Sequence, residues 1–257
     1  MKYIDIARDG PVFEVTLNHP KVNAINTLCS RELDQAFCQF RDDPSLRVAI
    51  ITGAGDRFFS AGWDLKAEES VNADHGPGGF AGLTERFDLN KPVIGAVNGM
   101  AVGGGLELAL ACDLVIAADH AAFLFPEVTI GMMPDAGGIL RLPKRIPRAI
   151  ALEMIYTGSP LTAERAYHYG LINRVVSGSE LMQETRKIAD KIVKAAPLAI
   201  AAAKEMLRHT EQESVEAGYQ IMRSGKLPAY QKMLQSDDVL EGQQAFVEKR
   251  EPVWTGK

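Results

Sequence analysis

Residues 91–113, which read KPVIGAVNGMAVGGGLELALACD, hold the pattern that decides the fold. The apolar run that ends in Asn-Gly (91–99) predicts a buried strand followed by a turn. The segment 103–113 opens with three glycines and continues as an apolar run, which predicts a helix. One carboxylate, Glu107, lies inside that run, and an anion among apolar residues costs several kcal/mol unless it is paired, hydrogen-bonded or neutralised. Glu107 therefore needs a structural or a chemical explanation.

Strands alternate with helices outward from this stretch, which predicts an α/β fold with layered sheets. A helix is expected after an N-cap at Asn26, and Gly158 and Gly170 are expected to end two later helices. Past Ala149 the pattern is mostly helical, so a C-terminal helical region is expected to pack on the α/β core or to extend from it. Strands are predicted at 13–20, 47–52, 91–99, 114–119 and 121–125, and helices at 26–40, 103–113, 149–158, 162–170, 180–196 and 198–210.

Composition excludes several classes of protein. The 257 residues suit one large domain or two small ones, and 46% hydrophobic and 24% charged residues are ordinary for a globular protein. The formal net charge of -5 opposes a general affinity for nucleic acid. No stretch approaches the ~18 apolar residues of a membrane span, and the N-terminus lacks targeting character, so we expect a cytoplasmic protein without membrane or nucleic-acid partners.

The cysteines and histidines do not form a recognisable metal site. Cys29, Cys38 and Cys112 contain no CxxC pair, and an odd number without a signal peptide favours reduced, buried thiols. The histidines form no HxxxH pair and have no ligand-spaced neighbours. We therefore expect no bound metal.

Three common catalytic motifs fail. TGAGDRF (52–58) follows a strand, but Phe58 replaces the third glycine of a dinucleotide fingerprint and no helix opens there. No GxxxxGK[ST] sequence is present, which excludes a P-loop. FFSAG (58–62) lacks the glycine that precedes the nucleophile of a serine hydrolase.

Glu107 has a companion in Glu127, 20 residues later and also between apolar residues. Taken alone, Glu107 could simply complement the positive end of its helix dipole. Two isolated acids in apolar surroundings are instead a candidate acid/base pair, because such surroundings can keep one protonated and the other ionised.

Two glycine turns resemble each other, at 60–63 (SAGW) and at 103–105 (GGG), each after a predicted apolar strand or short apolar run. Such turns can bring backbone N–H groups to one ligand, and a helix N-terminus adds positive potential, which suits a developing oxyanion. Tight packing of the turn is the alternative reason for the glycines. The Gly- and Pro-rich segment 70–82 predicts a flexible surface loop that could act as a lid.

The stretches RFFSAGWDL (57–65), 91–113, FPEVTIGMMPDAGGILRLP (125–143) and AYHYGLINRVV (166–176) resemble the enoyl-CoA hydratase/isomerase (crotonase) superfamily over nearly the whole chain. The resemblance implies a spiral of ββα units that carries the active site, over residues 1–195, and a C-terminal helical region that builds trimers, over 196–257. Trimers, or hexamers made of two trimers, are the expected assemblies.

The resemblance also implies a set of site residues. Glu107 and Glu127 match the hydratase acid/base pair, and the N–H groups of Trp63 and Gly104 match the oxyanion donors for a thioester carbonyl. The substrate is expected as a coenzyme A thioester, with no separate cofactor. Coenzyme A contacts are expected from Lys21, Asn23, Ala24, Ser60, Ala61, Gly62, Asp64 and Leu65, and from Phe246 and Lys249 toward a neighbouring subunit.

The expected reaction is addition or removal of water across the 2,3 double bond of an enoyl-CoA. Segments 58–67, 76–85 and 242–254, together with Asp135, look most like a subgroup whose acyl group carries a quaternary ammonium. Such a cation would favour aromatic faces, and Trp63, Phe80, Phe87 and Phe125 are available by type. A general fatty enoyl-CoA hydratase, an enoyl-CoA isomerase and a non-enzymatic RNA-binding protein remain alternatives, the last opposed by the acidic charge.

Overall fold

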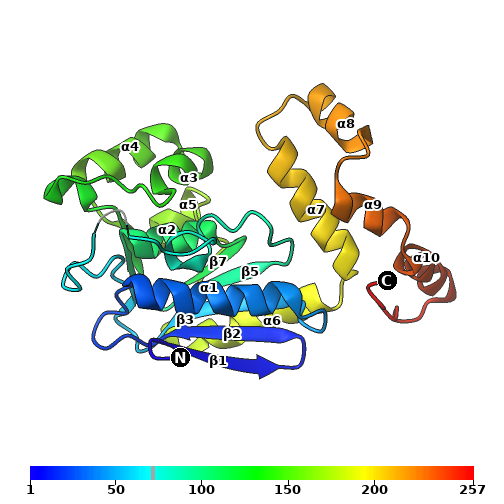
Figure 1. Cartoon of the computed structure of the whole chain (residues 1–257), viewed down its shortest axis with the longest axis horizontal. Coiled ribbons are helices and arrows are strands. Elements are labelled where there is room, and N and C mark those ends of the chain that lie inside the picture. The colour runs from blue at the N-terminus through cyan, green and yellow to red at the C-terminus, as the bar shows by residue number, and fades with distance from the viewer. Residues whose placement is uncertain (71–72) are drawn as a thin grey trace.

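The computed structural model describes residues 1–70 and 73–257, and within them two β-sheets form the centre of the molecule (Figure 1). The larger sheet has the strand order β1-β2-β3-β5-β7-β10, antiparallel between β1 and β2 and parallel elsewhere. The smaller sheet has the order β4-β6-β8-β9, with only β9 antiparallel to its neighbour. The strands are β1 (Ile4–Asp9), β2 (Val12–Leu17), β3 (Val48–Gly53), β4 (Phe58–Ser60), β5 (Val93–Val97), β6 (Met100–Val102), β7 (Leu114–Ala118), β8 (Ala122–Leu124), β9 (Leu161–Thr162) and β10 (Arg174–Val176).

From β3 to β8, successive strands alternate between the two sheets. β3, β5 and β7 are neighbours in the larger sheet, and the short strands that follow each of them, β4, β6 and β8, are neighbours in the same order in the smaller one. The chain therefore advances as a spiral of ββ turns, and α2 follows the second of them. This arrangement is the predicted α/β spiral.

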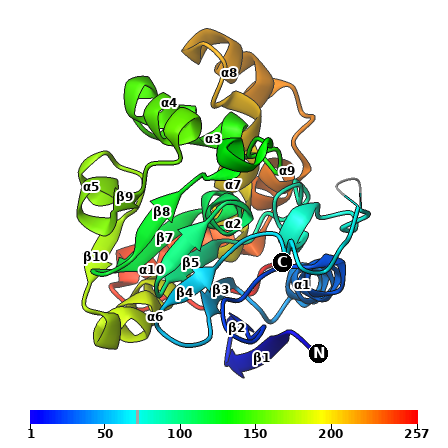
Figure 2. The ribbon, with the colours of Figure 1, turned by 90° about the vertical axis from the view of Figure 1, so that its left-hand side faces the viewer.

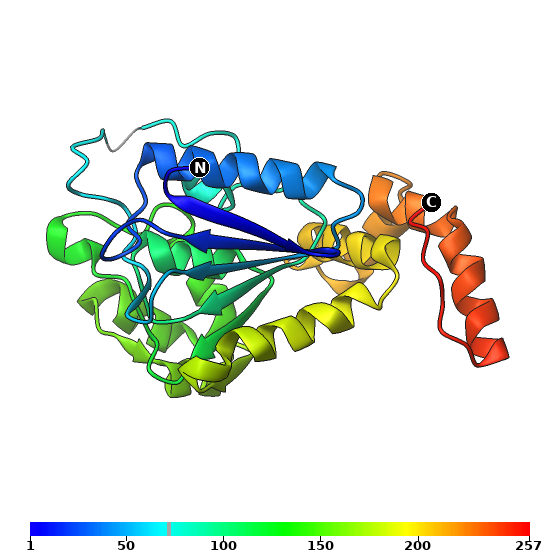
Figure 3. The ribbon, with the colours of Figure 1, turned by 90° about the horizontal axis from the view of Figure 1, so that it is seen from below.

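Helices cover both faces of the larger sheet, and Figure 3 shows α1 and α6 on opposite sides of it. Asn26 caps α1 as predicted, because its side chain accepts a hydrogen bond from the Cys29 N–H at 2.8 Å. The helices are α1 (Thr27–Asp42), α2 (Gly104–Ala111), α3 (Gly138–Arg145), α4 (Arg148–Thr157), α5 (Ala163–His168), α6 (Leu181–Val193), α7 (Pro197–Thr210), α8 (Val215–Arg223), α9 (Pro228–Leu234) and α10 (Asp237–Glu248), with short 3₁₀ turns η1 (Phe80–Gly82), η2 (Glu127–Ile130) and η3 (Gly178–Glu180).

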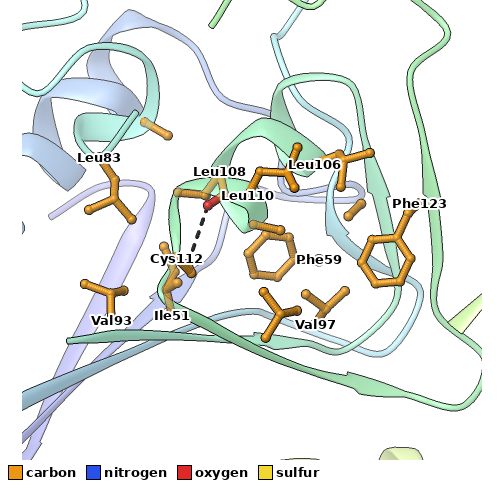
Figure 4. Packing of buried hydrophobic residues seen from close by; sticks show 14 of the residues in the cluster. Ile51, Phe59, Leu83, Val93, Val97, Leu106, Leu108, Leu110, Cys112 and Phe123 are labelled. Carbon is orange, nitrogen blue, oxygen red and sulfur yellow. Dashed lines mark hydrogen bonds between the residues drawn. The ribbon is translucent and has the colours of Figure 1, made fainter. Parts of the chain in front are cut away.

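The short helix α2 lies at the centre of the core. Leu106, Leu108 and Leu110 are almost fully buried, and Figure 4 shows them above Phe59 and Phe123 from the strands of the smaller sheet. The Cys112 thiol that ends this helix is buried and lies 3.4 Å from the Leu108 carbonyl oxygen. Cys29, Cys38 and Cys112 are all free thiols, as the sequence predicts.

The remaining helices fall into two groups. Figure 2 shows α3, α4 and α5 gathered beside the smaller sheet, far from β1. Helices α7 to α10 lead away from the sheets instead, and the C-terminus lies among them (Figure 1). α7 is tied to the core by the Lys204–Asp113 ion pair at 2.6 Å.

Some expectations need correction. Strand β1 and the three-residue strands β4 and β6 were absent from the predicted set. The segment 70–82 is not a surface loop throughout, because residues 78–82 are buried against α1, where the Gly78 N–H donates to the Asp34 carboxylate at 2.8 Å. Residues 71 and 72 of that predicted loop lie outside the described residues. In the rest of the chain, none of the helices combines the length and the apolar character needed to cross a membrane.

Candidate active site

Two glycine turns meet at the edge of the smaller sheet. β4 and β6 are parallel neighbours, so the turns that follow them, 61–63 and 103–105, leave the sheet side by side. A Cβ atom added at Gly62 would lie 2.7 Å from the Gly104 nitrogen and 2.6 Å from the Val102 oxygen. Only a glycine allows this approach, and Gly62 also has a φ of 78°, in the left-handed region. The structure thus brings together the two turns that the sequence pairs.

The backbone amides of these turns are suitable donors. Two backbone hydrogen bonds hold the 62–64 segment: the Ile25 N–H donates to the Gly62 carbonyl, and the Asp64 N–H donates to the Ile25 carbonyl. The Trp63 N–H between them has no acceptor among the described residues. Gly104 is the first residue of α2, and the first N–H groups of a helix have no partner within it. Both residues line the same cavity. The two residues and the positive end of a short helix therefore border the same cavity.

This cavity has a volume of about 280 Å³. Its wall is made by the two turns, by the segment around η1 and by residues from Pro126 to Ala136. The lining residues are Ala61, Trp63, Leu65, His75, Phe80, Glu85, Val102, Gly103, Gly104, Glu107, Pro126, Glu127, Ile130, Met132, Met133, Asp135 and Ala136.

Glu107 is a buried acid that reaches the cavity from the first turn of α2. It is 3% exposed, and one carboxylate oxygen accepts a hydrogen bond of 2.8 Å from the Gly138 N–H at the start of α3. Burial raises the pKa of Glu107, the Gly138 bond opposes the rise and the negative charge of Glu127 adds to it, and the result is a pKa of about 8. The carboxyl is therefore held mostly protonated near neutral pH.

Glu127 faces the same cavity from the start of η2. One of its oxygens lies against Gly103, where a Cβ atom would come within 2.8 Å of it. The other oxygen is buried and has no hydrogen-bond partner among the residues that the structure describes. Burial raises the pKa of Glu127 to about 7, and the charge of Asp135 adds to this effect. Two acids in one cavity with raised and different pKa values are suited to transfer protons in opposite senses.

The residues expected at coenzyme A fall into three sets. Ala61, Gly62, Asp64 and Leu65 belong to or follow the first turn, and Ala61 and Leu65 line the cavity. Lys21, Asn23 and Ala24 precede Ile25, which bridges to Trp63. Phe246, 86% exposed, and Lys249 lie at the end of α10 and do not line this cavity in their own chain.

Two further expected coenzyme A contacts, the side chains of Asn23 and Ser60, already form hydrogen bonds within the protein. The Asn23 amide donates to the Phe58 carbonyl at 2.9 Å and to the Ala54 carbonyl at 3.0 Å. The Ser60 hydroxyl is fully buried, donates to the Asn23 carbonyl at 2.7 Å and accepts from the Gly62 N–H at 3.1 Å. These bonds hold the first turn in place, so a contact from Asn23 or Ser60 to coenzyme A would come from the backbone.

Only some of the candidate aromatic residues lie at the cavity. Trp63 and Phe80 line the cavity, whereas Phe87 is exposed outside it and Phe125 is fully buried in the core. Sequence reasoning missed His75, Glu85 and Asp135 as lining residues. Asp135 stood out only as a departure from a common glycine, and nothing local marks His75 or Glu85 as partners of residues so distant in the chain.

Comparisons with known proteins identify the family of the chain. The sequence model of the enoyl-CoA hydratase/isomerase family matches residues 7–257. Carnitinyl-CoA dehydratases of Salmonella heidelberg and Salmonella typhimurium are 57% identical to the chain, over 99% of this chain and 98% of theirs. The crystal structure of an enoyl-CoA hydratase from Mycobacterium tuberculosis matches with a TM-score of 0.90 at 40% identity, over 99% of both chains. One from Bacillus anthracis matches with 0.89 at 36% identity, over 99% of this chain and 100% of that one.

The chain belongs to the enoyl-CoA hydratase/isomerase family. The resemblance drawn from the sequence motifs is thereby confirmed, as is the expected fold class.

Proposed function

We propose that this protein is a hydro-lyase that removes water from carnitinyl-CoA and adds it to crotonobetainyl-CoA, the trimethylammonium-bearing enoyl thioester. The observation that carries the reaction class is the pairing of Glu107 and Glu127 in one cavity beside the two glycine turns. The substrate rests on the 57% identical relatives that are named carnitinyl-CoA dehydratase. The substrate itself carries the coenzyme A, and no separate cofactor is invoked.

The thioester oxygen accepts hydrogen bonds from the Trp63 and Gly104 N–H groups. These bonds strengthen as the carbonyl gains enolate character, a contribution of roughly 3 kcal/mol for a typical donor of this kind. Their orientation is set by the packing of Gly62 on Gly104. The acyl chain then extends past the turns toward the two glutamates.

The two glutamates share one proton across the reaction. Burial raises the pKa of both glutamates, and it does so more strongly for Glu107, so Glu107 is the one that holds the shared proton in the resting site. In the dehydration direction Glu127 accepts the proton from the α-carbon, and Glu107 donates its proton to the leaving hydroxyl on the β-carbon. Hydration runs these transfers backwards, with Glu107 activating the water and Glu127 protonating the α-carbon.

The test compares turnover of crotonobetainyl-CoA with that of crotonyl-CoA by the same preparation. A higher kcat/KM for crotonobetainyl-CoA supports the proposal, and a preference for crotonyl-CoA favours a general fatty enoyl-CoA hydratase. A Glu107→Gln variant that keeps double-bond isomerisation while losing hydration favours an isomerase. Absence of RNA binding at low salt removes the non-enzymatic alternative.

We also propose that residues 196–257 assemble the chain into a homotrimer or a hexamer of two trimers, with Phe246 and Lys249 reaching the coenzyme A of a neighbour. Exposed apolar side chains on α7 to α10 support the assembly. Sedimentation analysis distinguishes the two states. A cytoplasmic location is proposed as well, supported by the three free thiols.

A further inference from the structure

The charges on the cavity wall are strongly one-sided. Its described lining residues include four carboxylates, Glu85, Glu107, Glu127 and Asp135, and neither a lysine nor an arginine. Glu107 and Glu127 are assigned to the proton transfers. Glu85 and Asp135 are exposed at the cavity wall and have no part in those transfers, so their charges are available to a bound ligand.

Asp135 is the better placed of these two acids. It lies between η2 and α3, close enough for its charge to raise the pKa of both Glu107 and Glu127. Within residues 1–70 and 73–257, no N–H group donates to its carboxylate and no cationic side chain pairs with it. An unpaired anion beside two acids opposes their ionisation. A cation bound in the cavity would offset that repulsion.

Aromatic side chains complete the same wall. Trp63, His75 and Phe80 line the cavity, and the His75 and Phe80 rings meet edge to face with their centroids 5.3 Å apart. Burial lowers the pKa of His75, which favours a neutral imidazole rather than a competing cation. Aromatic faces attract cations that have lost part of their hydration.

A quaternary ammonium can be recognised only by such features. It has no N–H group and donates no hydrogen bond, so charge and aromatic faces are the available means of selection. In the acyl group of crotonobetainyl-CoA, the nitrogen is attached to the carbon next to the β-carbon. Only one carbon therefore separates the cation from the β-carbon, at which Glu107 acts. This places the cation in the part of the cavity where the charge of Asp135 influences both Glu107 and Glu127.

We propose that Asp135 is a specificity-determining residue, whose carboxylate supplies the counter-charge for the substrate's trimethylammonium group beside the Trp63, His75 and Phe80 wall. The inference rests on the proposed function and adds which residue selects the cationic acyl group. Asp135 contacts the cation and takes no part in proton transfer.

The experiment uses crotonobetainyl-CoA and its uncharged isostere 5,5-dimethylhex-2-enoyl-CoA, in which a carbon replaces the nitrogen. Both substrates use the same glutamates, so any effect of Asp135 on their pKa cancels in the ratio of the two kcat/KM values. We expect Asp135→Asn to lower the charged-to-neutral ratio by about tenfold, mainly through KM for the charged substrate, as loss of a partly solvated ion pair predicts.

Two further variants complete the design. Asp135→Glu keeps the charge and should restore much of the ratio. Asp9→Asn makes the same chemical change on β1, at the outer edge of the larger sheet, where residue 9 is exposed, and should leave the ratio unchanged.

Equal losses for both substrates in Asp135→Asn, or an unchanged ratio, would overturn the assignment of Asp135. A wild-type enzyme that hydrates the isostere but not crotonobetainyl-CoA refutes the proposed function instead. The two failures are therefore distinguishable.

Discussion

The α/β core and the C-terminal region differ in how far they bury their large apolar side chains. In the core, large residues such as Phe13, Phe37 and Phe59 are fully buried between the sheets and helices. In the described residues after 196, the large apolar side chains that are at least 50% exposed are Leu207, Val215, Tyr219, Leu234, Leu240, Phe246, Val247 and Val253. The core forms a large apolar interior of its own, whereas the C-terminal region leaves most of its large apolar side chains on the surface, and the proposed assembly rests on this difference.

This difference separates chemistry from assembly. The acids, turns and cavity all belong to residues before 138, within the self-contained core. The C-terminal region contributes Phe246 and Lys249 only through the proposed contact with a neighbour. Changes in the core should therefore alter catalysis and leave assembly intact, and changes in the C-terminal surface should do the reverse.

The largest effect is expected from Glu107→Gln. Removing a positioned general acid/base should lower kcat by about a thousandfold in both directions. The amide oxygen can still accept from the Gly138 N–H, so folding and assembly should persist. The control is Glu213→Gln, the same change at an exposed position between α7 and α8, which should retain full activity. Loss of the oligomer in Glu107→Gln would contradict the proposal that catalysis and assembly depend on different regions of the chain.

The same variant should change how stability depends on pH. Glu107 has a folded pKa of about 8 against an ordinary value of 4.5, so the folded protein holds a proton that the unfolded chain releases between these pH values. Stability must then fall as pH rises through this window. We expect Glu107→Gln to lie within about 1 kcal/mol of wild type near pH 5 and to exceed it by about 5 kcal/mol near pH 8.5. Melting temperatures at both pH values test this, and equal curves at both would contradict the raised pKa.

Gly62→Ala should damage the meeting of the two turns. The added Cβ would approach the Gly104 nitrogen and the Val102 oxygen to within 2.7 Å and 2.6 Å. We expect about 2 kcal/mol of destabilisation beyond that of a matched control and a fall in kcat. The control is Gly55→Ala, which has a similar φ of 81° but no atom within 4 Å of the new Cβ. Equal effects of the two variants would show that backbone strain alone matters.

The smallest effect is expected in the C-terminal region. Leu240→Asp places a charge on an exposed part of α10, and we expect subunit association to weaken by about tenfold. Activity measured at high protein concentration should be retained. Leu28→Asp, on an exposed position of α1, is the matched control. Sedimentation at several concentrations gives the dissociation constants. An unchanged dissociation constant in Leu240→Asp would show that this part of α10 is not in the interface.

Local patterns predicted much of the fold. The Asn26 cap, the Gly158 helix end and the strands at β3, β5 and β7 depend on nearby residues, and the structure confirms them. The three-residue strands β4 and β6 were missed because two or three residues cannot establish a period. β1 was missed because most of its residues are exposed at a sheet edge and give little alternation.

The candidate site was predictable where its residues stood out from their sequence neighbours. Glu107 and Glu127 were visible as acids among apolar residues, and the paired turns were visible as repeated glycines. Asp135, His75 and Glu85 lie in polar or glycine-rich sequence, where a charge is ordinary. Their significance arises only when the fold places them around one cavity with residues from three other segments.

The anchoring of residues 78–86 has a consequence for how the acyl wall could diversify. Arg86, whose side chain is 2% exposed, pairs with Asp34 of α1 and donates to the Gly82 carbonyl at 2.9 Å. Phe80 lies between Gly78, which is bonded to the same Asp34, and Arg86, and it is thereby held against Gly104. The stretch just ahead of Gly78, which includes His75, lines the same cavity and lies outside these anchors. New acyl preferences could arise there by insertion or deletion, without rebuilding the catalytic frame.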